Sequence, residues 1–408
     1  MEIEAILLEG VEDQDRLAEL GRLGARLVIQ RAVEDELVAF LGRARYERTP
    51  TADGSRNGHR PRRVQTAEGE IVIAMPQVRD SLTRFVSSVI PDCRSVVRTR
   101  PLEALVIGAW VRGLSDRDIE SLAREAGLGT ISRTTVSGIC RELRDRYRAF
   151  RARSLAEVRL LALFCDAIYL PVRPEGPREG VLVAWGYTTD GQRVLLDVCL
   201  GQRERLEDWL DLGRGLIRRG LRSPLLVVSD GAPGLVGALT ELWPEADRQR
   251  CVVHRLRNVL AKLPERPGLH ERVKRAYWAA LDEAGSPAEA EQGLRALVGL
   301  LAADGFASAA ACLADDLGAL TVHLAYPLRL RTRLRSTNLL ERSLGEVRRR
   351  TKVIGRFPGE SSCLTLAWAV MDLVIAAAHG LGLTLPERQL IATMVTEREA
   401  PRLERQVA

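Results

Sequence analysis

Residues 160–170 read LLALFCDAIYL, and this stretch decides the fold because it places one carboxylate, Asp166, inside a long apolar run. Arg159 to Leu170 has the length and composition of a buried β-strand, and a proline follows it directly. Burying a charged carboxylate costs free energy unless something compensates it. Asp166 is therefore a candidate functional residue, with a hydrogen-bonded structural carboxylate as the alternative for this strand taken alone.

The pattern of strands and helices continues on the C-terminal side of this strand. Val181 to Thr188 and Val194 to Leu200 are two more apolar runs, and the Asp-Gly turn between them is typical of a β-hairpin. A helix is predicted from about Glu204 to Arg219. Pro224 to Asp230 reads PLLVVSD and predicts a fourth, buried strand, and Gln249 to Val253 a shorter fifth one. This order is that of an RNase-H-like α/β core.

Asp230 is the second candidate carboxylate, because it ends the fourth strand just before a Gly-Ala-Pro turn. In open α/β sheets the carboxyl ends of strands carry the functional groups. Taken singly, Asp230 is equally well interpreted as an Asp-Gly turn residue. Asp190, in the hairpin turn, and Asp197, on the third strand, are competing carboxylates, and the sequence leaves Asp197 open.

The third candidate is Glu341, within the stretch RSTNLLER at 335–342. The helical period of 3.6 residues puts Asn338, Glu341, Gly345 and Arg348 on one face, with Glu346 about 140° away. The spacing of Asn338 and Glu341 also resembles a capping box, which is the structural alternative. Three converging carboxylates suit two Mg²⁺ ions about 3.5–4 Å apart, since Mg²⁺ prefers oxygen ligands and keeps several waters.

Six regions are expected along the 408 residues. The N-terminal region is a helix over 1–45, a basic loop over 46–65 and a short strand from Glu70 to Met75. The fold class is α/β: an RNase-H-like catalytic core with a helical insertion, preceded by a mainly helical DNA-binding region. The regions are 1–100 for DNA binding or multimerisation, 101–157 helix-turn-helix-like, 158–255 first part of the core, 256–330 helical insertion, 331–385 rest of the core with the glutamate helix, and 386–408 charged tail.

Two segments are candidates for DNA contact. Ser115 or Asp116 is expected to cap one helix and Ser132 a second, in the manner of a helix-turn-helix motif, although an ordinary helical hairpin has the same pattern. Residues 329–356 hold ten Lys or Arg against two Glu, which suits a phosphate backbone. The candidate contact residues are Arg133, Thr134, Thr135, Arg342, Arg348, Arg349, Arg350 and Lys352.

Cys251 and His254 form a Cys-x-x-His pair. A structural zinc site usually needs two such pairs, and no second pair is present. Cys251, His254 and Asn338 are therefore predicted to be neighbours of the active site, with a core histidine as the alternative for His254. Seven scattered cysteines predict free, buried thiols in a reducing cytoplasm. The longest apolar stretch, Cys363 to Leu383, carries an internal aspartate and predicts a buried helix and no membrane span.

Several motifs resemble those of a known family. They are RNG at 56–58, LSDRDI at 114–119, the Cys-x-x-His-x-x-x-Asn run at 251–258, STNLLER at 336–342 and RRTKVIG at 349–355. With these residues the chain resembles the Mutator-type transposases of bacterial insertion sequences. The resemblance implies an RNase-H-like core with an Asp-Asp-Glu (DDE) triad on Asp166, Asp230 and Glu341. It also implies a helical insertion before the glutamate and an N-terminal part that binds terminal inverted repeats.

The hypothesis from sequence is a transposase that cleaves DNA at the ends of an insertion sequence and joins them to target DNA. Its expected cofactor is Mg²⁺, with Mn²⁺ as a substitute. Its expected partners are double-stranded DNA and at least one more copy of the chain, in the bacterial cytoplasm at the nucleoid. A DNA-binding regulator without chemistry and a nuclease that never joins strands are the alternatives.

Overall fold

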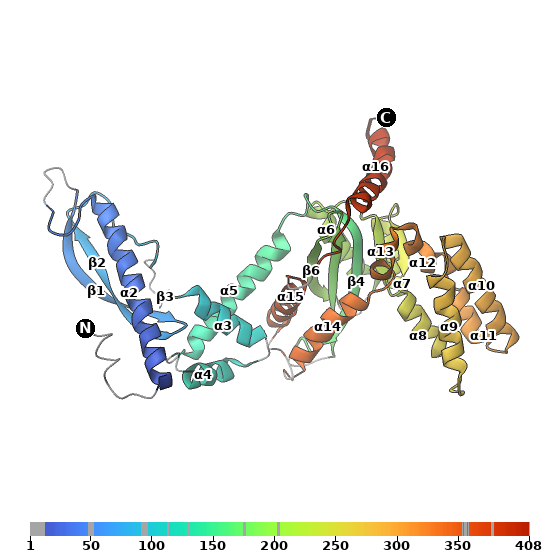
Figure 1. The fold of residues 1–408 in the computed structure, drawn as a ribbon, viewed down its shortest axis with the longest axis horizontal. Helices are drawn as coiled ribbons and strands as arrows, with labels where there is room; N and C mark the ends of the chain where they lie inside the picture. The colour runs from blue at the N-terminus through green and yellow to red at the C-terminus, as the bar shows by residue number, and fades with distance from the viewer. Residues whose placement is uncertain are drawn as a thin grey trace. The chain divides into compact units, whose positions relative to one another are not determined.

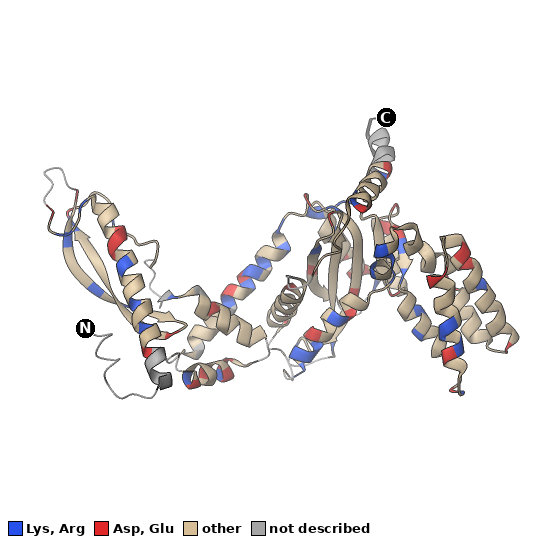
Figure 2. Cartoon of the chain, in the orientation of Figure 1, with Lys and Arg blue, Asp and Glu red and all other residues tan. Residues whose placement is uncertain are grey.

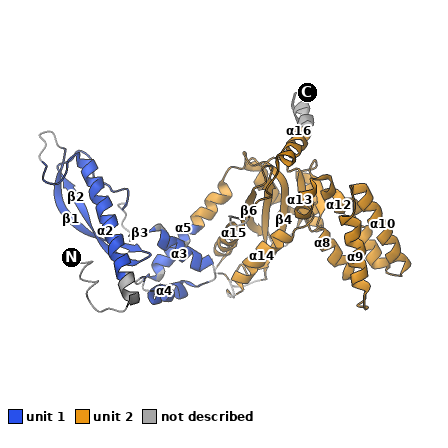
Figure 3. Ribbon diagram, in the orientation of Figure 1, with its two compact units in different colours: residues 1–143 blue, residues 144–408 orange. Residues whose placement is uncertain are grey.

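The computed structural model describes residues 13–47, 53–90, 97–111, 114–126, 128, 131–173, 177–201, 205–352, 354, 357, 359–376 and 379–407. The chain divides into two compact units, Met1–Leu143 and Arg144–Ala408 (Figure 3). The division falls inside one helix, α5 (Arg133–Ala152). Each unit is described by itself.

The first unit begins with a helix on a small sheet. Helix α2 (Asp13–Leu41) packs on β2 (Gly69–Arg79), which pairs antiparallel with β1 (Ser55–Thr66). A short parallel strand, β3 (Val97–Arg98), lies on the other side of β1. Buried aliphatic side chains fill the space between helix and sheet: Val33, Val64, Ile71, Ile73 and Ile90.

Two expectations for this region are wrong. The loop predicted over 46–65 forms β1 from Ser55 onward, and a register shift between Arg56 and His59 accommodates the Asn-Gly pair. The strand predicted at Glu70–Met75 extends to Arg79, because Pro76 lies on an edge strand where its missing N–H is tolerated.

Three helices complete the first unit: α3 (Arg100–Val111), α4 (Asp116–Glu125) and the start of α5. Both predicted caps are confirmed. The Ser115 hydroxyl accepts a hydrogen bond from the Asp118 N–H at 3.2 Å, within a capping box, and the Ser132 hydroxyl accepts one from the Thr135 N–H at 3.3 Å. Residues 127 and 129 of the predicted turn lie outside the described residues.

The second unit is built on a five-stranded mixed sheet (Figure 1). The strand order is β6-β5-β4-β7-β8, with β4, β5 and β6 antiparallel and β4, β7 and β8 parallel. The strands are β4 (Leu160–Leu170), β5 (Glu179–Thr188), β6 (Arg193–Gly201), β7 (Leu226–Ser229) and β8 (Asp247–Arg250). The first four follow the sequence prediction closely. The fifth ends earlier than predicted, because the chain turns at Cys251 into a helix.

Helices cover both faces of this sheet. Cys165 points into the core formed with α6 (Leu206–Arg218) and α7 (Pro233–Leu242). Successive strand residues point to opposite faces, so Asp166 faces the other side. Two further helices pack on the sheet: α14 (Asn338–Thr351) against β4, and α15 (Glu360–Ala376) against β6. These two helices also contact each other.

The chain between β8 and α14 is helical, as its Ala- and Leu-rich composition predicts (Figure 1). Its helices share a core of their own that includes Leu256, Val273, Tyr277, Leu294 and Leu320. They are α8 (Val252–Leu260), α9 (Leu269–Asp282), α10 (Pro287–Ala303), α11 (Ala307–Ala314), α12 (Leu317–Thr321), the 3-10 turn η1 (Val322–Ala325) and α13 (Leu328–Leu334), and α16 (Leu385–Val407) follows later.

Among the described residues, no helix is both long enough and apolar enough to span a lipid bilayer. The predicted free thiols are confirmed where they are described. Four of these cysteines are buried and Cys312 is partly buried. Cys93 and the side chain of Cys140 lie outside the described residues.

Candidate active site

The two aspartates lie next to each other on adjacent parallel strands. Strands β4 and β7 pair Phe164 with Val228, so two residues further along the register Asp166 comes beside Asp230. The Asp230 carboxylate accepts a hydrogen bond from the Ala232 N–H at 2.9 Å, which fixes it at the end of β7. Gly231 has a φ of +88°, and a Cβ there would lie 2.3 Å from the Arg250 Nε atom, so this turn requires glycine.

The electrostatics of Asp166 show that it lies among other acidic groups. Its pKa is raised from the ordinary 3.8 to about 6, first by burial and then by the charges of Asp230 and Glu341. The Ala167 N–H and the charge of His254 oppose this rise. The candidate triad is therefore one electrostatic cluster, in which a carboxylate is held at a cost in free energy.

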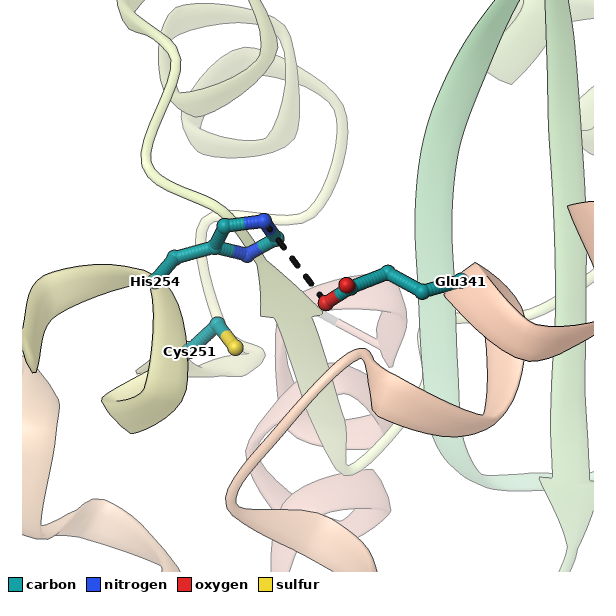
Figure 4. A group of neighbouring side chains, drawn as sticks. All are labelled: Cys251, His254 and Glu341. Atoms are coloured by element: carbon teal, nitrogen blue, oxygen red, sulfur yellow. Dashed lines mark ion pairs between the residues drawn. The ribbon is translucent and has the colours of Figure 1, made fainter. Parts of the chain in front are cut away.

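Glu341 reaches this cluster from the first turn of α14. The N-cap of that helix is Thr337, and Asn338 is its first, half-buried residue, so the capping-box alternative for Asn338 and Glu341 is wrong. The Glu341 carboxylate, 26% exposed, instead receives a hydrogen bond from the Arg257 guanidinium at 3.0 Å. It also lies 3.6 Å from the His254 Nε2 atom (Figure 4).

Cys251 and His254 border the cluster from the start of α8, rather than from the end of a strand as the sequence suggested. The fully buried Cys251 thiol accepts hydrogen bonds from the N–H and the hydroxyl of Thr337, both at 3.4 Å. Burial, the largest influence, raises the Cys251 pKa, but hydrogen bonds from His254 and Thr337 bring it below the ordinary value. The hydrogen bond to Cys251 raises the pKa of His254, which favours its charged form.

Glu341 also belongs to the tightest group of potential metal ligands in the described part of the chain. The ligand atoms of Cys251, His254 and Glu341 all lie within 4.8 Å of one another (Figure 4). The Cys-x-x-His pair thus gains a third potential ligand, but a closed zinc site needs a fourth. In this state the glutamate carboxylate is paired with α8.

The competing carboxylates lie elsewhere. Asp197 pairs in register with Ala184 and so shares the sheet face that α6 and α7 cover. Its buried carboxylate is bound by Arg219 at 2.7 Å and by Arg151 at 3.0 Å, which makes it a structural ion pair. Asp190 accepts a hydrogen bond from the Thr188 hydroxyl within the hairpin turn.

Basic residues lie along α14 (Figure 2), and Lys352 follows as its C-cap. Arg349 and Arg350 form ion pairs with Glu346, at 2.8 and 3.5 Å. Arg342, Arg348 and Lys352 are exposed. By helical period, Arg348 and Lys352 share the face of Glu341.

In the first unit, Thr134 is exposed and Thr135 half-buried at the start of α5. The Arg133 side chain lies outside the description.

Two residues of the site were not predicted. Arg257 lies one helical turn after His254 on α8, and that i, i+3 spacing was the available signal. Thr337 precedes the predicted Asn338 and contacts Cys251 and His254. Both contacts join residues more than 80 positions apart, which no local pattern specifies.

Comparison with known proteins identifies the class. Residues 4–375 match the family described as "Transposase, Mutator family". The chain is 34% identical over 347 residues to the transposase for insertion sequence element ISRM5 of Rhizobium meliloti (strain 1021), covering 85% of each chain. It is 30% identical to the transposase for element IS1201 of Lactobacillus helveticus, over 87% of this chain and 95% of the relative. The chain therefore belongs to the Mutator family of transposases.

Proposed function

We propose that this transposase binds the terminal inverted repeats of an insertion sequence and catalyses metal-dependent DNA cleavage and strand transfer, with Asp166, Asp230 and Glu341 as a DDE triad. The proposal includes an RNase-H-like core, supported by the order and directions of the five strands and by a helix that carries the third acid across β4. The observation that carries it is that Asp166 on β4 lies beside Asp230 at the end of β7, where the charges of Asp230 and Glu341 act on the half-buried Asp166.

The donor set fits Mg²⁺, or Mn²⁺ as a substitute. The negative charges of Asp230 and Glu341 contribute to the raised pKa of Asp166, and a divalent cation relieves such repulsion. Asp166, Asp230 and Glu341 would hold the metal ions through their carboxylate oxygens. When bound, the metal pair supplies Lewis-acid activation of the attacking and leaving oxygens of an in-line displacement.

Other residues of the chain hold the acids in place and bind the DNA. The Ala232 N–H holds the Asp230 carboxylate in place. Arg348 and Lys352, on the Glu341 face of α14, bind the DNA phosphate backbone and set the scissile phosphate near the acids. Water attacks first and leaves a 3′-hydroxyl on the element end. That hydroxyl then attacks a target phosphodiester and displaces one target 3′-oxygen, so each bond formed replaces one broken.

The proposal also assigns a role to each of the other regions, as expected from the sequence. Residues 101–157 read the element ends, with the exposed Thr134 among the contacts, and 1–100 serve DNA binding or multimerisation. Residues 256–330 form the helical insertion that delivers α14 to the sheet. Holding two ends together requires at least a homodimer, at work on DNA in the bacterial nucleoid.

The test is cleavage and joining of labelled DNA carrying the element's own ends, with Mg²⁺ or Mn²⁺. Asp166→Asn, Asp230→Asn and Glu341→Gln are expected to lose both reactions and keep end binding, while Asp190→Asn, a carboxylate outside the site, keeps both. Wild-type protein that binds the ends and never cuts would identify a regulator. Cutting without joining would identify a nuclease.

A further inference from the structure

We propose that Cys251 is a positioning residue, which fixes the helix of Glu341 to the strand of Asp230 and so sets the distance between two acids of the triad. This inference rests on the proposed function. It concerns a side chain that is 0% exposed.

Cys251 makes hydrogen bonds on two sides. Its own N–H donates to the carbonyl of Ser229, the residue before Asp230, at 2.7 Å. Its sulfur accepts from the N–H and the hydroxyl of Thr337, the N-cap of α14. One residue thereby connects the end of β7 with the start of the helix that carries Glu341 one turn later.

Neighbouring contacts strengthen this connection. The next N–H along the chain, that of Val252, donates to the Arg335 carbonyl at 3.0 Å. The Thr337 side chain makes no cap hydrogen bond to the backbone of its own helix; its hydroxyl contacts Cys251 and His254 Nδ1 on α8, and Glu341 Oε1 on α14 at 3.4 Å. The start of α14 is thus held from α8, and thiol removal leaves the buried Thr337 N–H without an acceptor, while the hydroxyl keeps its other partners.

This arrangement separates two tasks within α8. Cys251 binds the backbone of α14, while Arg257, whose side chain is 57% exposed, forms an ion pair with the Glu341 carboxylate. Groups that orient metal ligands without touching the metal typically change metal affinity or activity 10–100-fold when removed. The expected loss on removing the thiol is therefore about tenfold or more in metal affinity.

The experiment uses the full chain, four single variants and the Cys251→Ala/Thr337→Val double variant. Cys251→Ala removes the acceptor, Cys251→Ser restores an oxygen acceptor, and Thr337→Val removes the hydroxyl donor. Cys363→Ala is the matched control, because Cys363 is equally buried but lies on α15. Hydrogen exchange of the peptide spanning 335–345 and Mn²⁺ binding, followed by electron paramagnetic resonance, are the two readouts.

Cys251→Ala is expected to accelerate exchange at the start of α14 and to weaken Mn²⁺ binding about tenfold, with end binding retained. Cys251→Ser should stay within about threefold of wild type, and Thr337→Val should weaken Mn²⁺ binding by a smaller factor in a Cys251→Ala background than in wild type. Exchange and Mn²⁺ affinity unchanged in Cys251→Ala, or changed equally in Cys363→Ala, would overturn the inference.

Failure of the proposed function gives a different pattern. Wild-type protein would then bind no Mn²⁺ at the three acids and cleave no DNA, while the exchange rates at 335–345 would still report whether Cys251 holds α14.

Discussion

Removing the negative charge of Asp166 should stabilise the folded, metal-free protein. The folded-state pKa of about 6 lies above the ordinary value of 3.8, so ionisation of Asp166 opposes folding. Because the pKa is raised, this penalty is absent below pH 4, grows as the pH rises toward 6 and is complete above it. A rise of about two pKa units corresponds to about 3 kcal/mol.

Asp166→Asn is the appropriate change, because the amide keeps both the shape and the oxygen that accepts the Ala167 N–H at 2.8 Å. At pH 8 in EDTA the variant should unfold about 6–9 °C above wild type, since each kcal/mol shifts the melting temperature of a unit this large by about 2–3 °C. At pH 4 the difference should vanish. Added Mg²⁺ should stabilise wild type and leave the variant unchanged.

Thermal unfolding followed by intrinsic fluorescence measures this difference, and Asp190→Asn is the control because Asp190 lies in the hairpin turn. An Asp166→Asn variant that is no more stable than wild type at pH 8 in EDTA would refute the argument, since Asp166 would then be an ordinary, compensated structural carboxylate.

Three further predictions follow from the same contacts. Protons compete with the metal for Asp166, whose pKa is about 6, so the apparent Mn²⁺ dissociation constant should rise about tenfold from pH 7 to pH 5. A dissociation constant that does not change with pH would show that Asp166 is not a ligand. Arg257→Gln frees the Glu341 carboxylate from an exposed ion pair worth at most about 1 kcal/mol, so Mn²⁺ should bind up to about fivefold more tightly in a titration; weaker binding would contradict this. Arg348→Ala/Lys352→Ala should weaken binding of element ends and of unrelated DNA alike and lower the slope of log affinity against log salt by about two, whereas a loss confined to the ends would make these residues sequence readers.

The central sheet could be predicted from sequence because its signals are local. Asp166 breaks an apolar run and Asp230 ends one, so both candidate acids and their strands were visible without any knowledge of pairing. The helical segment before α14 was visible for the same reason, since its alanines and leucines repeat at helical spacing.

Long-range contacts explain what the sequence did not predict. Strand β1 is rich in Arg, Gly and Pro and is held by pairing with β2, so its own composition indicated a loop. The two valines after Cys251 indicated a strand, but Cys251 N–H bonds to Ser229 and Val252 N–H bonds to Arg335, and the chain turns there into α8. The pairing of Arg257 with Glu341 likewise depends on how α8 and α14 meet.

The most direct test of the shared metal site is localised backbone cleavage by Fe²⁺ in place of Mg²⁺, with ascorbate and peroxide, mapped by mass spectrometry on the full chain. If Asp166, Asp230 and Glu341 bind one metal cluster, cuts should appear beside all three, Mg²⁺ should suppress them together, and Asp166→Asn should abolish all of them. Cuts confined to Cys251 and His254, or cuts near Asp230 and Glu341 that survive Asp166→Asn, would contradict a metal site built on the triad.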